Sequence, residues 1–128
     1  MQSCLSSYEM SWKGPMTTTP RGELADAEAS LSSALGAGAV ITTPAELEAY
    51  TADTYWPALA AKAAGTPIAR PDVVVRPRTE EEVATVLAIA HERRVPVVPW
   101  GGGSGTQGGC LPIHGGIVVD LRSLDEVI

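Results

Sequence analysis

The stretch VPVVPWGGGSGTQGGCLPIHGG, residues 95–116, decides how the fold is interpreted. It holds eight of the chain's 13 glycines, six before Pro112 and two after it. Its inner part, GSGTQG at residues 103–108, matches the pattern G-x-G-x-x-G, which is typical of dinucleotide-binding folds of the Rossmann type. The stretch therefore raises the question of whether it binds a nucleotide phosphate, and within which fold.

The residues after these glycines exclude the two common phosphate-loop folds. In a Rossmann unit the third glycine opens a helix, but Pro112 and the pair Gly115-Gly116 leave no room for one. In a Rossmann unit an acidic residue follows about 20 residues further on, and Asp120 comes too early for it. A Walker loop needs Gly-Lys followed by Ser or Thr, which the sequence lacks.

The residues on either side of the loop predict short parallel strands. DVVVRP at residues 72–77 is a continuous run of β-branched residues, which is typical of a fully buried strand. VPVV at 95–98 predicts a second strand, so residues 73–98 form a parallel strand–helix–strand unit. GIVVDL at 116–121 predicts a third strand, and RSLDEVI at the end of the sequence predicts a turn or a helix.

The segment RTEEEVATVLAIAHERR, residues 78–94, predicts the helix of this unit. Thr79 followed by Glu82 three residues later is a capping box, in which each side chain bonds a free main-chain N–H group. Arg93 and Arg94 lie in the last turn, where cations suit the helix dipole. The expected apolar stripe consists of Val83, Val86, Leu87 and Ala90.

The N-terminal part predicts a loose leader followed by helices. Residues 1–21 are rich in Ser, Thr and Pro and have no signal-peptide core, so we expect a flexible leader. Residues 21–35 repeat Leu and Ala at helical spacing, and Pro44 suits the first turn of a second helix. Residues 51–67 are expected to be loop and partial turn. We take residues 22–66 together as the helical N-terminal segment. The sequence leaves open whether Met1 or Met16 is the start.

The bulk composition excludes several classes of protein. The 128 residues are 45% hydrophobic, which is typical of a single globular domain. The formal net charge is −6 and the longest basic run is Arg93-Arg94, so we expect no nucleic-acid partner. No apolar run reaches the roughly 20 residues of a membrane span. Cys4 and Cys110 indicate no disulfide framework, so we expect a cytoplasmic protein.

The chemistry of the glycine loop favours phosphate binding. Runs of glycine let successive main-chain N–H groups converge on an anion without obstruction by side chains. Ser104 and Thr106 add hydroxyl donors, and no Lys or Arg lies nearby to supply a point charge. The alternative is a loop of tight turns without a ligand. The position directly after a buried strand of a strand–helix–strand unit favours phosphate.

Three motifs in this order resemble the FAD-linked oxidase family with a PCMH-type FAD-binding domain. They are P-x-x-x-x-x-P followed by Glu-Glu-Val, the V-P-V-V-P strand, and G-G-G-[ST]-G-x-x-G-G. The branch it resembles includes glycolate oxidase, D-lactate dehydrogenase and alkyldihydroxyacetonephosphate synthase. The resemblance runs from about Tyr50 to Ile128, and Tyr50 and Asp53 resemble the family's first segment. It implies an α+β fold in which residues 67–128 are the first, incomplete part of the FAD-binding domain.

The resemblance also implies which residues bind FAD. Their main-chain N–H groups wrap the pyrophosphate, and the residues are Gly101, Gly102, Gly103, Ser104 and Gly105, continued by Thr106, Gly108 and Gly109. Trp100 stands where many relatives carry Arg, and it packs either under the loop or against the adenine. Some relatives attach flavin covalently through a His inside the motif; Ser104 occupies that region, so we expect non-covalent FAD.

Other conspicuous side chains are expected to be structural. His91 and His114 are expected on the surface, and Cys110 as a packed, inert thiol. Asp120 is expected to cap the turn at Arg122-Ser123. Trp56, together with Tyr55, could line a flavin or domain interface, but we expect it in the core. No catalytic residue and no metal site is predicted.

The resemblance implies an FAD-dependent oxidoreductase that takes a hydride from a 2-hydroxy acid or a similar alcohol, a small-molecule substrate. The second half of the FAD domain and the substrate domain are not in this sequence, so we expect this part alone to be inactive. The alternatives are a non-catalytic nucleotide- or anion-binding module and an inactive truncated relic.

Overall fold

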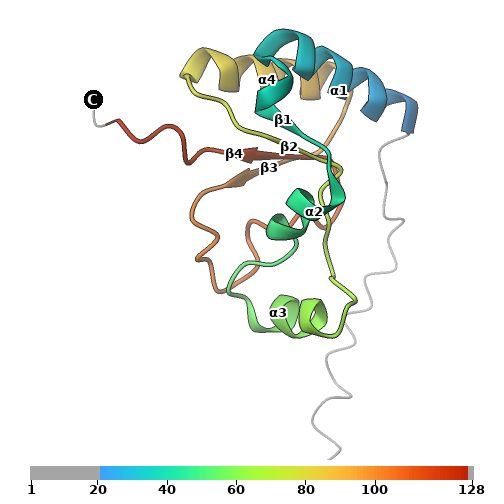
Figure 1. Cartoon of the computed structure of the whole chain (residues 1–128), viewed down its shortest axis with the longest axis vertical. Helices are drawn as coiled ribbons and strands as arrows, with labels where there is room; N and C mark the ends of the chain where they lie inside the picture. Colours follow the sequence, from blue (N-terminus) through green and yellow to red (C-terminus); the bar gives the residue numbers. More distant parts are fainter. Residues whose placement is uncertain (1–20, 127–128) are drawn as a thin grey trace, which may run out of the picture.

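The computed structural model describes residues 21–126, and a four-stranded sheet lies at its centre (Figure 1). The strands are β1 (Val40–Ile41), β2 (Val73–Val75), β3 (Val97–Trp100) and β4 (Ile117–Asp120), in the spatial order β1-β2-β4-β3. β1 is antiparallel to β2, whereas β2, β4 and β3 run parallel. With helices packed around this sheet, the predicted α+β fold with a short parallel sheet is confirmed.

The last strand of the chain lies between two earlier ones. β4 pairs with β2 on one side, where Val73 lies opposite Ile117, and with β3 on the other, where Val97 lies opposite Ile117. Because β3 and β4 are parallel, the glycine loop that joins them starts at the carboxyl edge of the sheet and returns to its amino edge. The loop therefore spans the full length of the strands.

Helices lie on both faces of the sheet (Figure 1). On one face, α1 (Arg21–Leu35) and α4 (Glu80–Glu92) cover the odd-numbered residues of β2 and β4, such as Val73 and Val119. On the other, α2 (Pro44–Leu47) and the short helix η2 (Glu48–Tyr50) cover Val74 and Val118. Burial on both faces explains why the central strands are continuous runs of Val and Ile.

α1 begins at Arg21, and the predicted flexible leader at residues 1–21 otherwise lies outside the described residues. Met1, Cys4 and Met16 also lie outside them. The expected turn after β4 is present, since the Leu124 N–H donates to the carbonyl of Leu121 at 3.0 Å.

The predicted capping box of α4 is confirmed, and its apolar stripe is corrected. The Glu82 N–H donates to Thr79 Oγ1 at 3.2 Å, and the Glu82 carboxylate accepts from the Arg78 N–H at 2.6 Å. Val86 and Ala90 are buried against α1, but Leu87 is 48% exposed. The α4 side chains packed in the cluster with α1 include Val86, Ala90 and Ile89, and Leu87 lies outside it.

The strand expected at residues 95–98 instead begins at Val97 and ends at Trp100. The Val95 N–H donates to the carbonyl of Ala90 at 2.9 Å, so Val95 belongs to the turn that ends α4. The ladder with β4, in which Trp100 lies opposite Asp120, sets the bounds of β3. Apolar residues alone could not locate them, because Val95 is buried without pairing.

The segment expected to be loop at residues 51–67 contains a helix, α3 (Trp56–Ala63). Pro57 occupies its first turn, where a missing N–H costs little, and alanine favours the helix. Ala58 is buried against Ala69 and Leu111. The expectation that Trp56 packs in the core is wrong, because this side chain is 75% exposed at the first position of the helix.

Replacement of Thr79 tests how much the N-terminal cap of α4 stabilises the protein. We expect Thr79→Ala to lower the free energy of unfolding by about 1 kcal/mol, because an N–H at the helix start loses its acceptor. Chemical denaturation measures this. Thr85→Ala is the control, since Thr85 donates to the carbonyl of Glu81 in mid-helix; equal effects of the two substitutions would contradict the role of the cap.

Candidate functional site

The first part of the glycine loop, residues 101–110, leaves its main-chain N–H groups free. None of them donates to an acceptor among residues 21–126. In the second part of the loop, by contrast, the N–H groups of Leu111, Ile113, Gly115 and Gly116 all donate within the protein. Most residues of the first part are exposed, including Ser104 and Thr106 with their hydroxyls. The free donors are therefore accessible to an anion.

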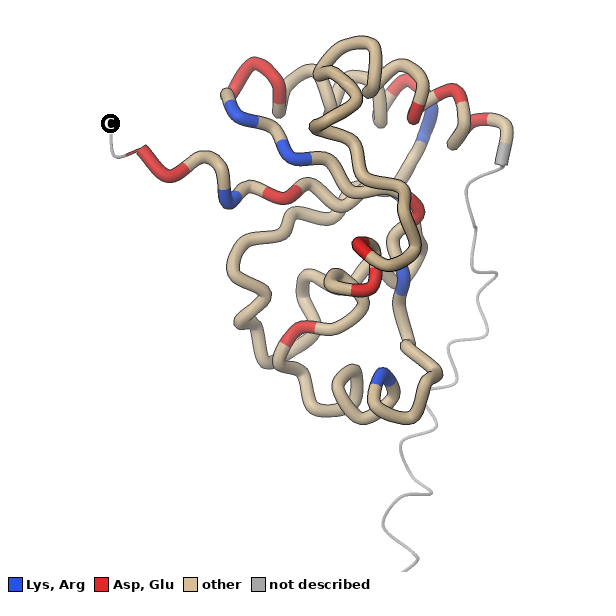
Figure 2. Tube along the Cα trace, viewed as in Figure 1, with Lys and Arg blue, Asp and Glu red and all other residues tan. Residues whose placement is uncertain are grey.

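The loop carries no charged side chain. Figure 2 shows neither Lys nor Arg between β3 and β4, and the sequence holds no Asp or Glu there either. An anion on this loop would be neutralised by main-chain dipoles, as expected.

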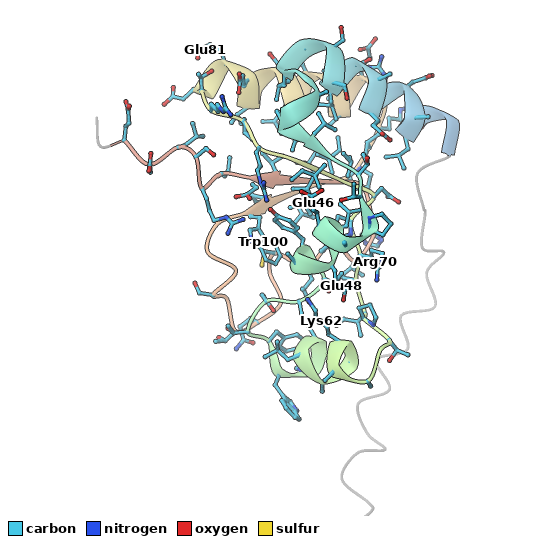
Figure 3. All side chains as sticks on the ribbon, viewed as in Figure 1. Glu46, Glu48, Lys62, Arg70, Glu81 and Trp100 are labelled. Carbon is cyan, nitrogen blue, oxygen red and sulfur yellow. The ribbon has the colours of Figure 1, made fainter. Side chains whose placement is uncertain are left out.

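Trp100 packs under the loop, where it holds the turn at Gly103 (Figure 3). Its side chain is buried, and a Cβ atom on Gly103 would lie 2.7 Å from its ring. Gly103 also has φ +64°, a conformation that side chains disfavour. Trp100 in turn contacts Tyr50 edge-on, with 5.2 Å between ring centroids. Of the two packing alternatives for Trp100, the structure has the one under the loop.

Residues 53–55 hold the outer part of the loop. The Thr54 N–H donates to the carbonyl of Gly105 at 3.1 Å, and Thr54 Oγ1 lies within hydrogen-bond distance of the carbonyls of Ser104 and Gly105. Asp53 is buried below, where it accepts from the Tyr55 N–H at 2.9 Å and lies 3.5 Å from Cys110 Sγ. The contacts of Thr54 join segments about 50 residues apart in the sequence.

A charged cluster lies at the carboxyl edge of the sheet, next to the start of the loop. Asp120 is buried and accepts from Tyr50 Oη at 2.8 Å, from Arg122 Nη2 at 2.7 Å and from Arg76 Nε at 3.3 Å. Both guanidinium groups also donate to Tyr50 Oη. The cluster ties β2, β4 and η2 together at one edge.

The cluster changes the acidity of its members. Burial by itself would raise the pKa of Asp120, but hydrogen bonds from Arg122 and Tyr50 outweigh it and hold that pKa well below its usual range. The same contacts with Asp120 raise the pKa of Arg122. Asp120 is therefore ionised in the folded protein.

Sequence reasoning found only one contact of this cluster. Asp120 Oδ1 accepts from the Arg122 N–H at 3.2 Å, which is the predicted cap of the next turn. The side-chain contacts of Arg76 and Arg122 with Asp120 were not predicted, although the order of the strands indicates them. Arg76 directly follows β2 and Arg122 follows β4, and the carboxyl ends of neighbouring parallel strands lie at the same edge.

The two histidines, His91 and His114, lie on the surface, as expected. Cys110 is half-buried, and burial together with the nearby Asp53 raises the pKa of its thiol, which disfavours the reactive thiolate. Among residues 21–126, no three His, Cys, Asp or Glu side chains gather as a metal site would require. None of the helices in this range is long and apolar enough to cross a membrane.

A cavity of about 490 Å³ lies away from the loop, at the start of α4. It is lined by residues 78–80 and 123–126. Because no residue of the glycine loop lines it, the loop and this cavity are separate features.

Comparisons with known proteins agree with the geometry of the loop. Residues 71–128 match the family described as FAD binding domain. A probable mitochondrial D-lactate dehydrogenase of Danio rerio is 43% identical over 58 residues, 45% of this chain and 12% of that protein. Glycolate oxidase subunit GlcD of Bacillus subtilis is 38% identical over 58 residues, with the same two coverages of 45% and 12%.

A solved structure of alkyldihydroxyacetonephosphate synthase superposes with a TM-score of 0.75 at 22% identity, covering 81% of this chain and 20% of that one. This likeness concerns the fold. The aligned part of the chain spans about an eighth of the length of these curated relatives, 12% in both cases.

Substitution at Gly103 tests the packing of the loop on Trp100. We expect Gly103→Ala to cost about 2 kcal/mol of stability, because the added Cβ meets the indole ring and the backbone is strained. Gly101→Ala is the matched control, since a Cβ there meets nothing within 4 Å. Thermal and chemical denaturation measure both; an unchanged stability of Gly103→Ala would contradict the packing.

Asp120→Asn tests the charged cluster. We expect a loss of about 2 kcal/mol at neutral pH, because two arginines and Tyr50 lose an ionised acceptor. The exposed Asp125→Asn in the same segment is the control and should leave stability unchanged.

The pH dependence of stability has a defined sign. The pKa of Asp120 is lower in the folded than in the unfolded protein. Its contribution to the free energy of unfolding is therefore complete above about pH 4, near the ordinary pKa of an Asp. That contribution is lost as the pH falls further. Acid titration of stability should therefore be steeper for the wild type than for Asp120→Asn; parallel curves would contradict the depressed pKa.

Proposed function

We propose, because residues 71–128 match the FAD binding domain family, that this chain forms the pyrophosphate-binding part of an FAD-dependent oxidoreductase. The observation that carries the proposal is the row of free main-chain N–H groups at residues 101–110, directly after β3. Such a row matches the charge and the shape of a pyrophosphate, whose oxygens accept several hydrogen bonds at once.

The residues present fit this ligand. Gly101, Gly102, Gly103 and Gly105 leave the main chain bare, so a phosphate can approach to hydrogen-bond distance. The Ser104 and Thr106 hydroxyls lie on the exposed side of the loop and add two donors. Gly108 and Gly109 continue the bare main chain, and Trp100 supports the turn from below. Because the motif contains no His, we propose non-covalent binding.

The redox chemistry belongs to the cofactor. When bound, the flavin accepts a hydride from a carbon that carries a hydroxyl group. We propose a 2-hydroxy acid or a similar alcohol as substrate, since lactate and glycolate, named for two relatives, are both 2-hydroxy acids. In this proposal the residues of the glycine loop hold the pyrophosphate in place.

We propose that the flavin ring and the substrate are bound by residues outside positions 1–128. The support is that the 58 aligned residues correspond to 12% of the length of the relatives and that the matched region contains a single phosphate loop. On its own, the chain then holds part of the FAD site, and we expect it to bind FAD weakly.

Ligand titration of the isotope-labelled chain tests the proposed function. We expect FAD and ADP, which both carry a pyrophosphate, to shift the amide NMR signals of residues 101–109, and riboflavin to shift none of them. A response to riboflavin alone, or shifts confined to the cavity at residues 78–80 and 123–126, would contradict pyrophosphate binding by the loop.

The same titration distinguishes the alternative of a general anion-binding module. If inorganic pyrophosphate binds as tightly as FAD and ADP, the loop does not select a nucleotide. Reduction of a dye by D-lactate or glycolate with added FAD is expected to be absent for this chain alone.

A further inference from the structure

We propose that Thr54 is a positioning residue, which fixes the direction of two N–H groups that bind the pyrophosphate. The inference rests on the proposed function and adds a residue outside the matched FAD binding domain, which begins at residue 71. It identifies the segment before α3 as part of the cofactor site.

The geometry of the peptide bond carries this inference. The carbonyl of Ser104 shares a peptide plane with the N–H of Gly105, and the carbonyl of Gly105 shares one with the N–H of Thr106. In a trans peptide, the carbonyl and the N–H point in opposite directions, and the structure has no cis peptide among the described residues. A contact that holds both carbonyls therefore also aims both N–H groups.

Thr54 makes that contact with both carbonyls. Its hydroxyl has one proton, which can go to the carbonyl oxygen of Ser104, 3.0 Å away, while the carbonyl oxygen of Gly105 lies 2.8 Å from the same hydroxyl. Its main-chain N–H donates to the carbonyl of Gly105 at 3.1 Å. The N–H groups of Gly105 and Thr106 consequently point away from Thr54, and neither has an acceptor within residues 21–126. Two adjacent donors that face the same side form a cradle for an anion.

The segment that carries Thr54 is itself fixed. Upstream, Tyr50 is buried and bonded to Asp120, and the Thr51 hydroxyl donates to the carbonyl of Glu48 at 2.9 Å. Beside it, Glu48 pairs with Arg70 at 2.8 Å, and Lys62 of α3 donates to the Glu48 carbonyl (Figure 3).

Downstream, buried Asp53 accepts from the Tyr55 N–H, and α3 follows directly. Thr54 is thus a fixed point on the rigid part of the fold, against which an exposed glycine loop is aligned.

Alignment matters here because the site has no cation. A lysine or arginine attracts a phosphate over a range of directions, whereas an N–H group bonds well only when it points at the acceptor. A loop rich in glycine also loses more conformational entropy on ordering than other sequences do. Contacts that order it before the ligand arrives therefore increase affinity.

The test compares Thr54→Val with a matched control and a conservative variant. Thr54→Val removes the hydroxyl and keeps the shape and the main-chain N–H. Thr66→Val is the control, since Thr66 is also exposed and its hydroxyl lies 3.4 Å from the carbonyl of Ala61, away from the loop. Thr54→Ser keeps the hydroxyl and should behave like the wild type.

Two measurements are made on each form of the chain. The first is the residual dipolar coupling of the Gly105 and Thr106 N–H bonds without ligand, which reports their direction and order. The second is the dissociation constant for FAD. We expect Thr54→Val to reduce the coupling of the Gly105 N–H towards zero, because the Ser104 carbonyl loses its donor, and to change that of Thr106 less, because the Thr54 N–H still holds the Gly105 carbonyl. We expect FAD binding to weaken about tenfold, equivalent to about 1.4 kcal/mol. Thermal denaturation checks that all forms remain folded.

The outcomes separate this inference from the proposed function. If FAD shifts no loop signal in the wild type, the proposed function fails, and the couplings alone decide whether Thr54 orients the loop. If FAD binds the wild type, and Thr54→Val keeps the wild-type couplings and the wild-type affinity for FAD, the positioning role is overturned. A loss in Thr54→Val that Thr54→Ser does not restore would also overturn it, because the hydroxyl would not be responsible.

Discussion

The pairing of β4 between β2 and β3 constrains the rest of the structure. Because β4 is parallel to both neighbours, the chain leaving β3 must return along the whole sheet before it can pair again. The return is made by a loop rather than a helix, and Pro112 and the glycines permit the extended path. The insertion also places Asp120 at the carboxyl edge between Arg76 and Trp100, so the charged cluster and the loop begin at the same place.

Two kinds of contact hold the loop in place. Its base rests on an apolar support, in which Trp100 contacts both Gly103 and Tyr50. Its outer part is held by polar contacts of Thr54 with two carbonyls. Both supports come from one short segment, because Tyr50 ends η2 and Thr54 lies between η2 and α3. This segment connects the sheet core to the exposed N–H groups.

The sequence predicted the features that depend on neighbouring residues. The capping box of α4 and the buried run of β2 follow from local spacing and side-chain type, and both are confirmed. Contacts over long distances along the chain were not predicted. Thr54 carries no local signal for its bond to a loop 50 residues away, and Trp56 and Leu87 were assigned to the core because hydrophobicity does not reveal which face is covered. The free main-chain N–H groups of the glycine loop could be expected, since they depend on consecutive residues.

The absence of charge on the glycine loop has a consequence for how quickly a ligand arrives. The chain carries a net charge of −6, and FAD, the proposed ligand, is itself an anion, so long-range electrostatic forces would oppose their encounter. Main-chain dipoles act over short distances and cannot attract the ligand from solution. Association is thus slowed at low ionic strength and becomes faster as salt screens the repulsion. This is the opposite of a phosphate site built on arginines, where salt weakens the attraction that speeds binding.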